Sequence, residues 1–185
     1  MRTFIAVELD PKIKSALSEL IDRLSPKDAD VKWVKKQGMH ITLKFLGEVP
    51  ETKIQDIIYS LRKACDSLDS FQLCFRGTGF FPPKNKLPRV LWAGIEQSPH
   101  LAILHERIEV ELGKLGFLRE KRSFHPHLTL GRVKSSKNIN ALLEELEKHR
   151  ETNFGRMKAE KVALIKSTLK PAGAEYDILS EIQLK

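Results

Sequence analysis

The sequence predicts an α+β protein made of two similar lobes, each a small sheet backed by helices, that face each other across a groove. Two observations support this class. Segments with the alternation of strands are interspersed with amphipathic helical stripes along the 185 residues. The tetrapeptide His-x-Thr-Leu also occurs twice, at residues 40–43 and 127–130. Each copy is followed by a polar loop, an amphipathic helix and another strand, so residues 40–75 and 127–164 form a coarse structural repeat.

The N-terminal segment predicts a strand followed by a helix. Residues 4–9 have the apolar character of a buried strand, after which Asp10 and Pro11 favour a helix start. Ser25 and Pro26 are expected to end this helix. Its apolar stripe consists of Ile13, Leu17, Leu20, Ile21 and Leu24.

Further strands and a second helix follow before the middle of the chain. Strands are expected at residues 31–34 and 39–46, and Thr52 is predicted to cap the second helix. Residues 71–75 alternate as a strand. Residues 76–86 are rich in turn residues and positive charge, which predicts a loop.

The second half of the chain predicts two helices among short strands. Ser98 and Pro99 favour the start of a third helix, and the apolar spacing of residues 139–146 predicts a fourth. The remaining strands are predicted at residues 90–95, 154–158, 161–169 and 175–182, with a turn at 171–173.

The two His-x-Thr-Leu motifs place the same side chains together. In a strand, residues i and i+2 share a face. His40 and Thr42 therefore share one face, while the apolar residues between and after them occupy the other. The second motif groups His127 and Thr129 in the same way, with two leucines behind them.

Two histidines in one cleft suit acid–base catalysis on a phosphodiester. Imidazole has an unperturbed pKa of ~6.5, so one ring can be neutral and the other protonated near neutral pH. Such a pair can take a proton from water and give a proton to a leaving oxygen. Threonine hydroxyls can donate to phosphate oxygens, and Arg or Lys can stabilise the anion. The sequence contains no nucleophile elbow or phosphate-binding loop that would favour another chemistry.

The composition favours an intracellular protein with an anionic partner. The 32 Lys and Arg residues exceed the 24 Asp and Glu residues, giving a formal net charge of +8. This excess favours nucleic acid, although solubility alone would also account for it. Cys65 and Cys74 lack metal-knuckle spacing, so reduced thiols and a cytoplasmic location are expected. No apolar run reaches the ~18 residues of a membrane span, and the N-terminus is typical of a strand rather than a signal peptide.

His125 offers an alternative, because His125 and His127 could present two metal ligands on one strand. Pro126 removes a hydrogen-bond donor from such a strand, and no Cys or acidic partner has suitable spacing. We therefore predict no metal and expect His125 to orient a neighbour or to pack beside the cleft. The other histidines are expected to be solvated on helices or helix ends: His100, His105 and His149.

Several aromatic and basic residues allow two interpretations. Trp33 and Trp92 are expected in the core, with base stacking as the alternative. Two basic groups are either solvated or in contact with an RNA backbone: Lys84, Lys86 and Arg89, and then Lys121 and Arg122 just before the second motif.

The paired motifs and their surroundings resemble the 2H phosphoesterase superfamily, whose members carry two His-x-Thr/Ser-x motifs. The sequence is most similar to the bacterial and archaeal RNA 2′,3′-cyclic phosphodiesterases, first described as 2′-5′ RNA ligases. The matching stretches are spread over nearly the whole chain: residues 2–9, 40–47, 88–94, 124–132 and 167–179.

The resemblance implies a single bilobal domain over residues 1–185, with two intertwined, pseudo-symmetric lobes that each contain a small antiparallel sheet. It implies that the enzyme opens the cyclic phosphate at an RNA 3′ end to a 2′-phosphomonoester without a metal or other cofactor. If the 5′ hydroxyl of a second RNA replaced water, the same site could form a 2′-5′ linkage as a secondary activity.

The resemblance also implies roles for individual residues. His40 would be the general acid for the leaving 3′ oxygen, and His127 the general base for water. Because the two motifs are nearly symmetric, the residues alone leave these two roles interchangeable. The positions that match substrate-binding residues of the family are Thr42 and Thr129, at the phosphate oxygens, and Phe45 and Arg132, near the terminal nucleotide.

Two other functions compete with this one. An RNA-end binding module without chemistry is disfavoured because both motifs are intact. A 2H enzyme could instead act on a small nucleotide, such as a cyclic ADP-ribose phosphate or a 2′-5′ oligonucleotide. The expected partners are therefore RNA ends or nucleotides that carry a cyclic phosphate. The sequence leaves the oligomeric state open, and a monomer is the expectation.

Overall fold

The computed structural model describes residues 1–83, 87–121, 123–171 and 173–185. Within these residues no helix is long and apolar enough to cross a bilayer. The RNA contacts considered for Lys84, Lys86 and Arg122, and the centre of the turn at Ala172, lie outside the described residues.

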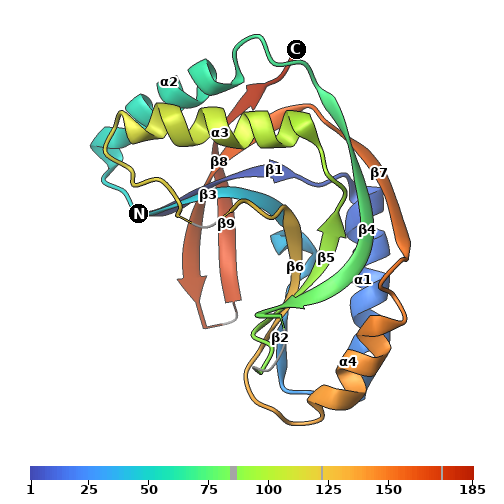
Figure 1. The fold of residues 1–185 in the computed structure, drawn as a ribbon. Coiled ribbons are helices and arrows are strands. Elements are labelled where there is room, and N and C mark those ends of the chain that lie inside the picture. Colours follow the sequence, from blue (N-terminus) through green and yellow to red (C-terminus); the bar gives the residue numbers. More distant parts are fainter. Residues whose placement is uncertain (84–86, 122, 172) are drawn as a thin grey trace.

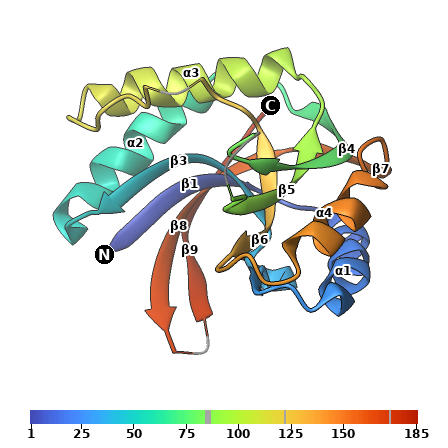
Figure 2. The same cartoon turned by 60° about the horizontal axis from the view of Figure 1, so that its bottom comes forward.

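The first sheet has four antiparallel strands in the order β3-β1-β8-β9. Helices α2 and α3 lie side by side against one face of this sheet, as both ribbon views show (Figures 1 and 2). The elements of this half are β1 (Arg2–Glu8), β3 (His40–Glu48), β8 (Lys161–Lys170), β9 (Gly173–Gln183), α2 (Ile54–Cys65) and α3 (Pro99–Gly113).

The second sheet has five antiparallel strands in the order β2-β6-β5-β4-β7. Helices α1 and α4 lie next to each other on its outer side (Figure 2). The elements of this half are β2 (Val31–Trp33), β4 (Phe71–Phe81), β5 (Val90–Ile95), β6 (His127–Val133), β7 (Asn153–Ala159), α1 (Pro11–Leu24) and α4 (Ile139–Glu147).

The predicted α+β class and its two-lobe arrangement are confirmed. The predicted repeat also holds in order, since β3 is followed by α2 and β4, and β6 by α4, β7 and β8. Each copy starts with a motif strand in one sheet and reaches a strand of the other sheet. The chain therefore passes back and forth between the sheets, and one apolar core contains residues of both.

Side-chain caps explain the starts of α1 and α3, whereas α2 and α4 begin without one. Asp10 accepts a hydrogen bond from the Lys12 amide at 2.7 Å, and Ser98 accepts one from the Leu101 amide at 3.2 Å, as predicted. The prediction for Thr52 is wrong. Thr52 lies within a 3-10 turn, and the helix begins after it at Ile54 without a side-chain cap.

The prediction that a loop begins at residue 76 is also wrong, because β4 continues through Phe81. Gly77 has a φ of +78° at an irregularity in the pairing of β4 with β5. Gly79 lies beneath the indole of Trp92, where a Cβ atom would be 2.3 Å from Trp92 Cζ2. Gly77 therefore allows a β-bulge, and Gly79 allows the indole to pack closely on the strand; neither glycine forms a turn.

Candidate active site

The two motif strands have the predicted alternation. Ile41 and Leu128 are fully buried in the core, whereas His40 and Thr42 on β3 are half-buried on the opposite face. His127 has the same half-buried character on β6, as does Thr129 in the same strand. Each sheet thus presents one histidine and one threonine on the face that is turned away from its helices.

Aromatic rings surround His40 on the first sheet. Its ring centroid lies 4.6 Å from that of Phe4 and 5.2 Å from that of Tyr176. Phe4 is directly opposite Phe45 across β1 and β3, and their ring centroids are 5.9 Å apart. Phe45 is 63% exposed, so an apolar ring is available to a ligand on the same face as His40.

The surroundings of His40 favour its neutral form. Burial lowers the pKa of His40 from 6.5 to about 4, and the positive charge of Lys14 adds to this shift. Lys14 is itself held by Glu8, with Nζ 3.4 Å from the carboxylate. Glu8 pairs with His40 across β1 and β3, so this charge pair borders the imidazole.

A second aromatic group surrounds His127. The ring of Phe81 meets the imidazole edge-on at 5.1 Å and lies 5.4 Å from the indole of Trp92. Trp92 also pairs directly with Thr129 across β5 and β6. The core position expected for Trp92 is therefore wrong, because its indole lies half-buried on the face of His127. Trp33, by contrast, packs over Gly131 against the core, as predicted.

Arg132 lies on the same face as His127. Val90 pairs with Phe81 on one side and with Arg132 on the other. Directly opposite residues share a face of a sheet, and Phe81 contacts His127. Arg132 is exposed and has Lys32 as its neighbour on β2, so two cations border this face.

The hydrogen bond of His127 defines its neutral tautomer. The Nδ1 atom lies 2.7 Å from the carbonyl oxygen of His125. A carbonyl oxygen can only accept, so Nδ1 carries the proton and Nε2 of the neutral ring has a free lone pair. His125 therefore orients its neighbour, one of the two roles expected for it, and does so through its backbone. Its own side chain is exposed.

The threonine hydroxyls are available to a ligand. Neither Thr42 nor Thr129 hydrogen-bonds through its hydroxyl to any other described residue. Each hydroxyl can therefore donate to an anion on its face. No group of three or more His, Cys, Asp or Glu side chains is placed to hold a metal ion among the described residues.

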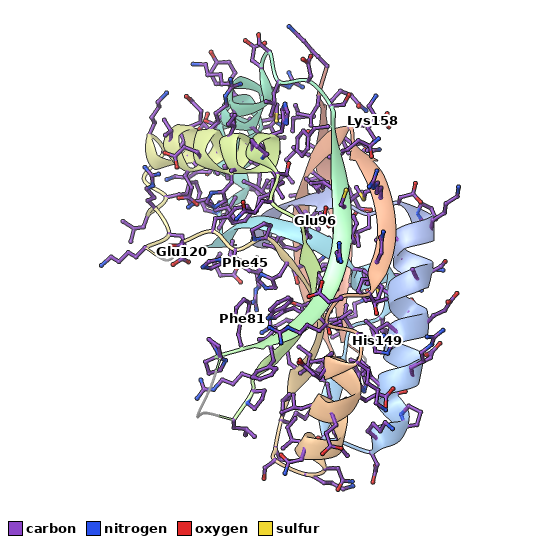
Figure 3. The ribbon with its side chains drawn as sticks, turned by 45° about the vertical axis from the view of Figure 1, so that its right-hand side comes forward. Phe45, Phe81, Glu96, Glu120, His149 and Lys158 are labelled. Atoms are coloured by element: carbon purple, nitrogen blue, oxygen red, sulfur yellow. The ribbon has the colours of Figure 1, made fainter. Side chains whose placement is uncertain are left out.

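The two histidine-bearing faces open to the same side of the molecule. Phe45 marks the first face and Phe81 the second, and Figure 3 shows both on one side of the ribbon. Sequence reasoning missed Phe4, Phe81 and Tyr176, although all three rings contact a motif histidine. Such contacts depend on which strands become neighbours in the sheets.

One of the remaining histidines also differs from its prediction. His100 is exposed and stacks on Phe71, in agreement with a surface position. The solvated position predicted for His105 is wrong, because its side chain is only 13% exposed and its ring stacks on Phe124. The cause is the segment before β6, which folds back over α3 and covers this imidazole.

Two antiparallel sheets, each with one His-x-Thr pair on its open face, define the fold of a 2H phosphoesterase. The crystal structure of a Thermus thermophilus protein superimposes with a TM-score of 0.84 at 29% identity, covering 100% of this chain and 98% of that one. The structure of Escherichia coli LigT complexed with 3′-AMP gives a TM-score of 0.81 at 24% identity, with coverage of 99% and 97%.

The chain belongs to the 2′-5′ RNA ligase superfamily, whose family model matches residues 11–171. A Methanothermobacter thermautotrophicus protein named RNA 2′,3′-cyclic phosphodiesterase is 35% identical over 184 residues, which span 100% of this chain and 99% of the relative. A Thermotoga maritima protein of the same name is 37% identical over 187 residues, spanning 100% and 96%. The chain is therefore an enzyme of this superfamily.

Proposed function

We propose that the enzyme hydrolyses the 2′,3′-cyclic phosphate at an RNA 3′ end to a 2′-phosphomonoester. The observation that carries the proposal is the placement of one His-x-Thr pair on each of two sheet faces that open to the same side. The names of full-length relatives supply the cyclic phosphate and the RNA. The proposed site lies within one domain over residues 1–185, and the free thiols of Cys65 and Cys74 agree with a cytoplasmic location.

His127 is proposed as the general base. Its Nε2 lone pair takes a proton from a water molecule as the water oxygen attacks phosphorus. The bond between phosphorus and the ribose 3′ oxygen breaks, and His40 as general acid gives that oxygen a proton. The phosphate remains on the 2′ oxygen. The products are a 2′-phosphomonoester and a free 3′ hydroxyl, and the two histidines afterwards exchange the proton through solvent.

The remaining polar groups are proposed to bind the anion. Thr42 and Thr129 donate to the non-bridging phosphate oxygens, one from each face. Phe45 supplies an exposed ring to the terminal nucleotide, and Arg132 adds positive charge at the edge of the second face. None of these roles requires a metal ion, and a chelator should leave turnover unchanged.

The acid role of His40 depends on the bound substrate. The pKa of about 4 keeps the imidazole neutral at pH 7 in the free protein. A phosphate anion beside the ring favours the imidazolium and raises its pKa. Substrate binding is therefore proposed to bring the proton that the leaving oxygen later receives.

Ligation is proposed as a secondary activity of the same site. The 5′ hydroxyl of a second RNA would take the place of water, and His127 would accept its proton. A 2′-5′ linkage would form as the 3′ oxygen leaves. The superfamily name supports this activity, whereas the greater abundance of water favours hydrolysis.

The test is turnover of an RNA that ends in a 2′,3′-cyclic phosphate, followed by identification of the hydroxyl that keeps the phosphate. His40→Ala and His127→Ala should each lower kcat by about 10²–10⁴-fold, the usual contribution of a general acid or base. His100→Ala is the matched control, because this exposed ring lies at the start of α3. Wild-type turnover in either motif variant, or a 3′-phosphate product, would refute the proposal.

A further inference from the structure

A buried polar network lies behind β3, on the side away from His40. Lys44 and Glu109 are only 6% and 2% exposed. Lys44 Nζ donates to both carboxylate oxygens of Glu109 at 2.8 Å and to the carbonyl of Leu118 at 2.9 Å. All three ammonium protons thus have an acceptor, which is the condition for a charge pair to be tolerated in a core.

A β-bulge explains why Lys44 faces inward. Ala6 pairs with Thr42 and Ile5 pairs with Lys44, so Leu43 is an extra residue between the two pairs. The bulge interrupts the alternation and turns Lys44 towards α3, while Thr42 remains on the face of His40. A single strand therefore contributes both to the proposed site and to the network behind it.

The network holds the segment that leads into the second motif. Within the described part of residues 117–126 there is neither helix nor strand, and side chains supply much of its support. Glu109 accepts a hydrogen bond from the Glu120 amide at 3.2 Å, and Glu120 lies below α3 in Figure 3. His105 stacks on Phe124 with ring centroids 3.9 Å apart and an interplanar angle of 8°.

His105 links this stack to the charge pair. Its Nε2 atom lies 3.8 Å from a carboxylate oxygen of Glu109. Burial lowers the pKa of His105, so its ring is neutral near pH 7. The network then contains one buried cation, one buried anion and a neutral ring, all tied to the segment before β6.

We propose that Lys44, Glu109 and His105 are positioning residues for the reaction, an inference that rests on the proposed function. Phe124 is followed directly by His125, whose carbonyl accepts the Nδ1 proton of His127. Holding the segment in place fixes the position of this carbonyl. The hydrogen bond to the carbonyl in turn selects the Nδ1-protonated tautomer, which leaves the Nε2 lone pair free. The network thereby couples the first motif strand to the proton acceptor of the second.

The first test separates positioning from stability. Lys44→Met alone leaves Glu109 buried without a cation, so it should destabilise the protein as well as slow the reaction. The double variant Lys44→Met/Glu109→Leu removes both charges, and such replacements are often neutral or stabilising, so its Tm should return towards the wild-type value. The double variant still lacks the ties to Leu118 and Glu120. Its kcat should stay lower by about 100-fold, with KM changed by no more than about twofold.

The second test needs no turnover. Nitrogen-15 NMR of the His127 ring in the free protein should show a single Nδ1-protonated tautomer in the wild type and a mixture in the double variant. The matched control is Lys114→Met/Glu111→Leu, which removes a surface ion pair from the end of α3. This control should keep both the single tautomer and the wild-type kcat.

Phe124→Leu provides an independent variant that keeps both buried charges. It removes the aromatic stack on His105 while keeping an apolar side chain against the core, and it should also give mixed His127 tautomers and a lower kcat. The inference fails if a folded double variant, or Phe124→Leu, retains a single tautomer and the wild-type kcat. If the wild type does not hydrolyse cyclic-phosphate RNA, the proposed function fails, whereas the NMR comparison still decides the positioning role.

Discussion

At the scale of single residues, two copies of the His-x-Thr-Leu motif place their imidazoles in two different environments. His40 is surrounded by rings and has Lys14 nearby, and its pKa is about 4. His127 is oriented by the His125 carbonyl, which leaves its Nε2 lone pair for a proton. The sequence could locate the pair but left the acid and base roles interchangeable. The difference arises from neighbours in space. The His125 carbonyl makes His127 a suitable base, whereas His40 must gain its proton when substrate binds in order to act as the acid.

The Lys14→Met variant tests the electrostatic control of His40. Removing the cation eliminates one cause of the lowered pKa and also leaves Glu8 unpaired beside the ring. Both changes favour the imidazolium, so the pKa of His40 should rise from about 4 towards 6.5. An NMR titration of the free protein measures this shift. Lys12→Met, on the exposed side of the same helix, should leave the titration unchanged. An unaltered His40 titration in Lys14→Met would contradict this account.

The lowered pKa of His40 also makes folding depend on pH. In the unfolded chain the ring titrates near 6.5, whereas in the folded protein it titrates near 4. The unfolded state therefore binds the proton first as the pH falls, and the stability contributed by this group is lost between pH 6.5 and 4. Above that window the contribution is complete. Denaturant unfolding of His40→Gln should show a smaller loss across the window than the wild type, and equal losses would exclude the linkage.

At the scale of elements, the spacing of apolar residues correctly predicted the strands and helices that bury one face in the core. The motif strands and the helical stripes follow the alternation or spacing of their own apolar residues. The same reasoning failed for β4, because Gly77 and Gly79 suggest turns when only their neighbours in sequence are considered. Their roles, a bulge and the close approach of Trp92, depend on a partner strand that lies further along the chain.

Interruptions of regular pairing account for the other features that the sequence did not reveal. Strict alternation would place Lys44 on the same face as His40, but the bulge at Leu43 turns it into the core. Tyr176 contacts His40 although β9 and β3 are the two edge strands of the first sheet. A single sequence contains no local signal for strand order, so these neighbours could not be predicted.

The Gly79→Ala variant tests the close approach of β4 and β5. The added Cβ would lie 2.3 Å from Trp92 Cζ2, so the indole or the strand must shift. Such overpacking typically costs about 1–3 kcal/mol, and a displaced indole would also disturb Phe81 beside His127. Thermal unfolding should show a lower Tm, with reduced turnover.

Gly113→Ala is the control for this substitution. It lies at the exposed end of α3, and a Cβ there meets nothing within 4 Å. Alanine favours helix over glycine, so this variant should match or exceed the wild-type Tm. If Gly79→Ala were as stable and as active as Gly113→Ala, the tight packing under Trp92 would contribute neither to stability nor to turnover.

At the scale of the whole molecule, the proposed site exists only when both sheets are assembled. The first motif is on β3 and the second on β6, and the chain passes between the sheets several times. The segment before β6 and the buried charge pair behind β3 provide a direct link between the halves. Folding of either sheet alone would therefore leave one histidine without its partner.

The net charge of the whole chain predicts that turnover of an RNA end and of a small nucleotide would respond differently to salt. With a formal charge of +8, and with Lys32 and Arg132 at the edge of the second face, an RNA strand should gain affinity from phosphates beyond the cyclic one. Each neutralised phosphate releases counterions, so kcat/KM for an RNA should fall steeply as salt rises from about 50 to 200 mM. A 2′,3′-cyclic mononucleotide offers one phosphate and should show a much shallower dependence. Kinetic measurements on both substrates across this salt range provide the comparison. Equal slopes would mean that the body of the RNA makes no electrostatic contact, and they would favour a small cyclic nucleotide as the substrate.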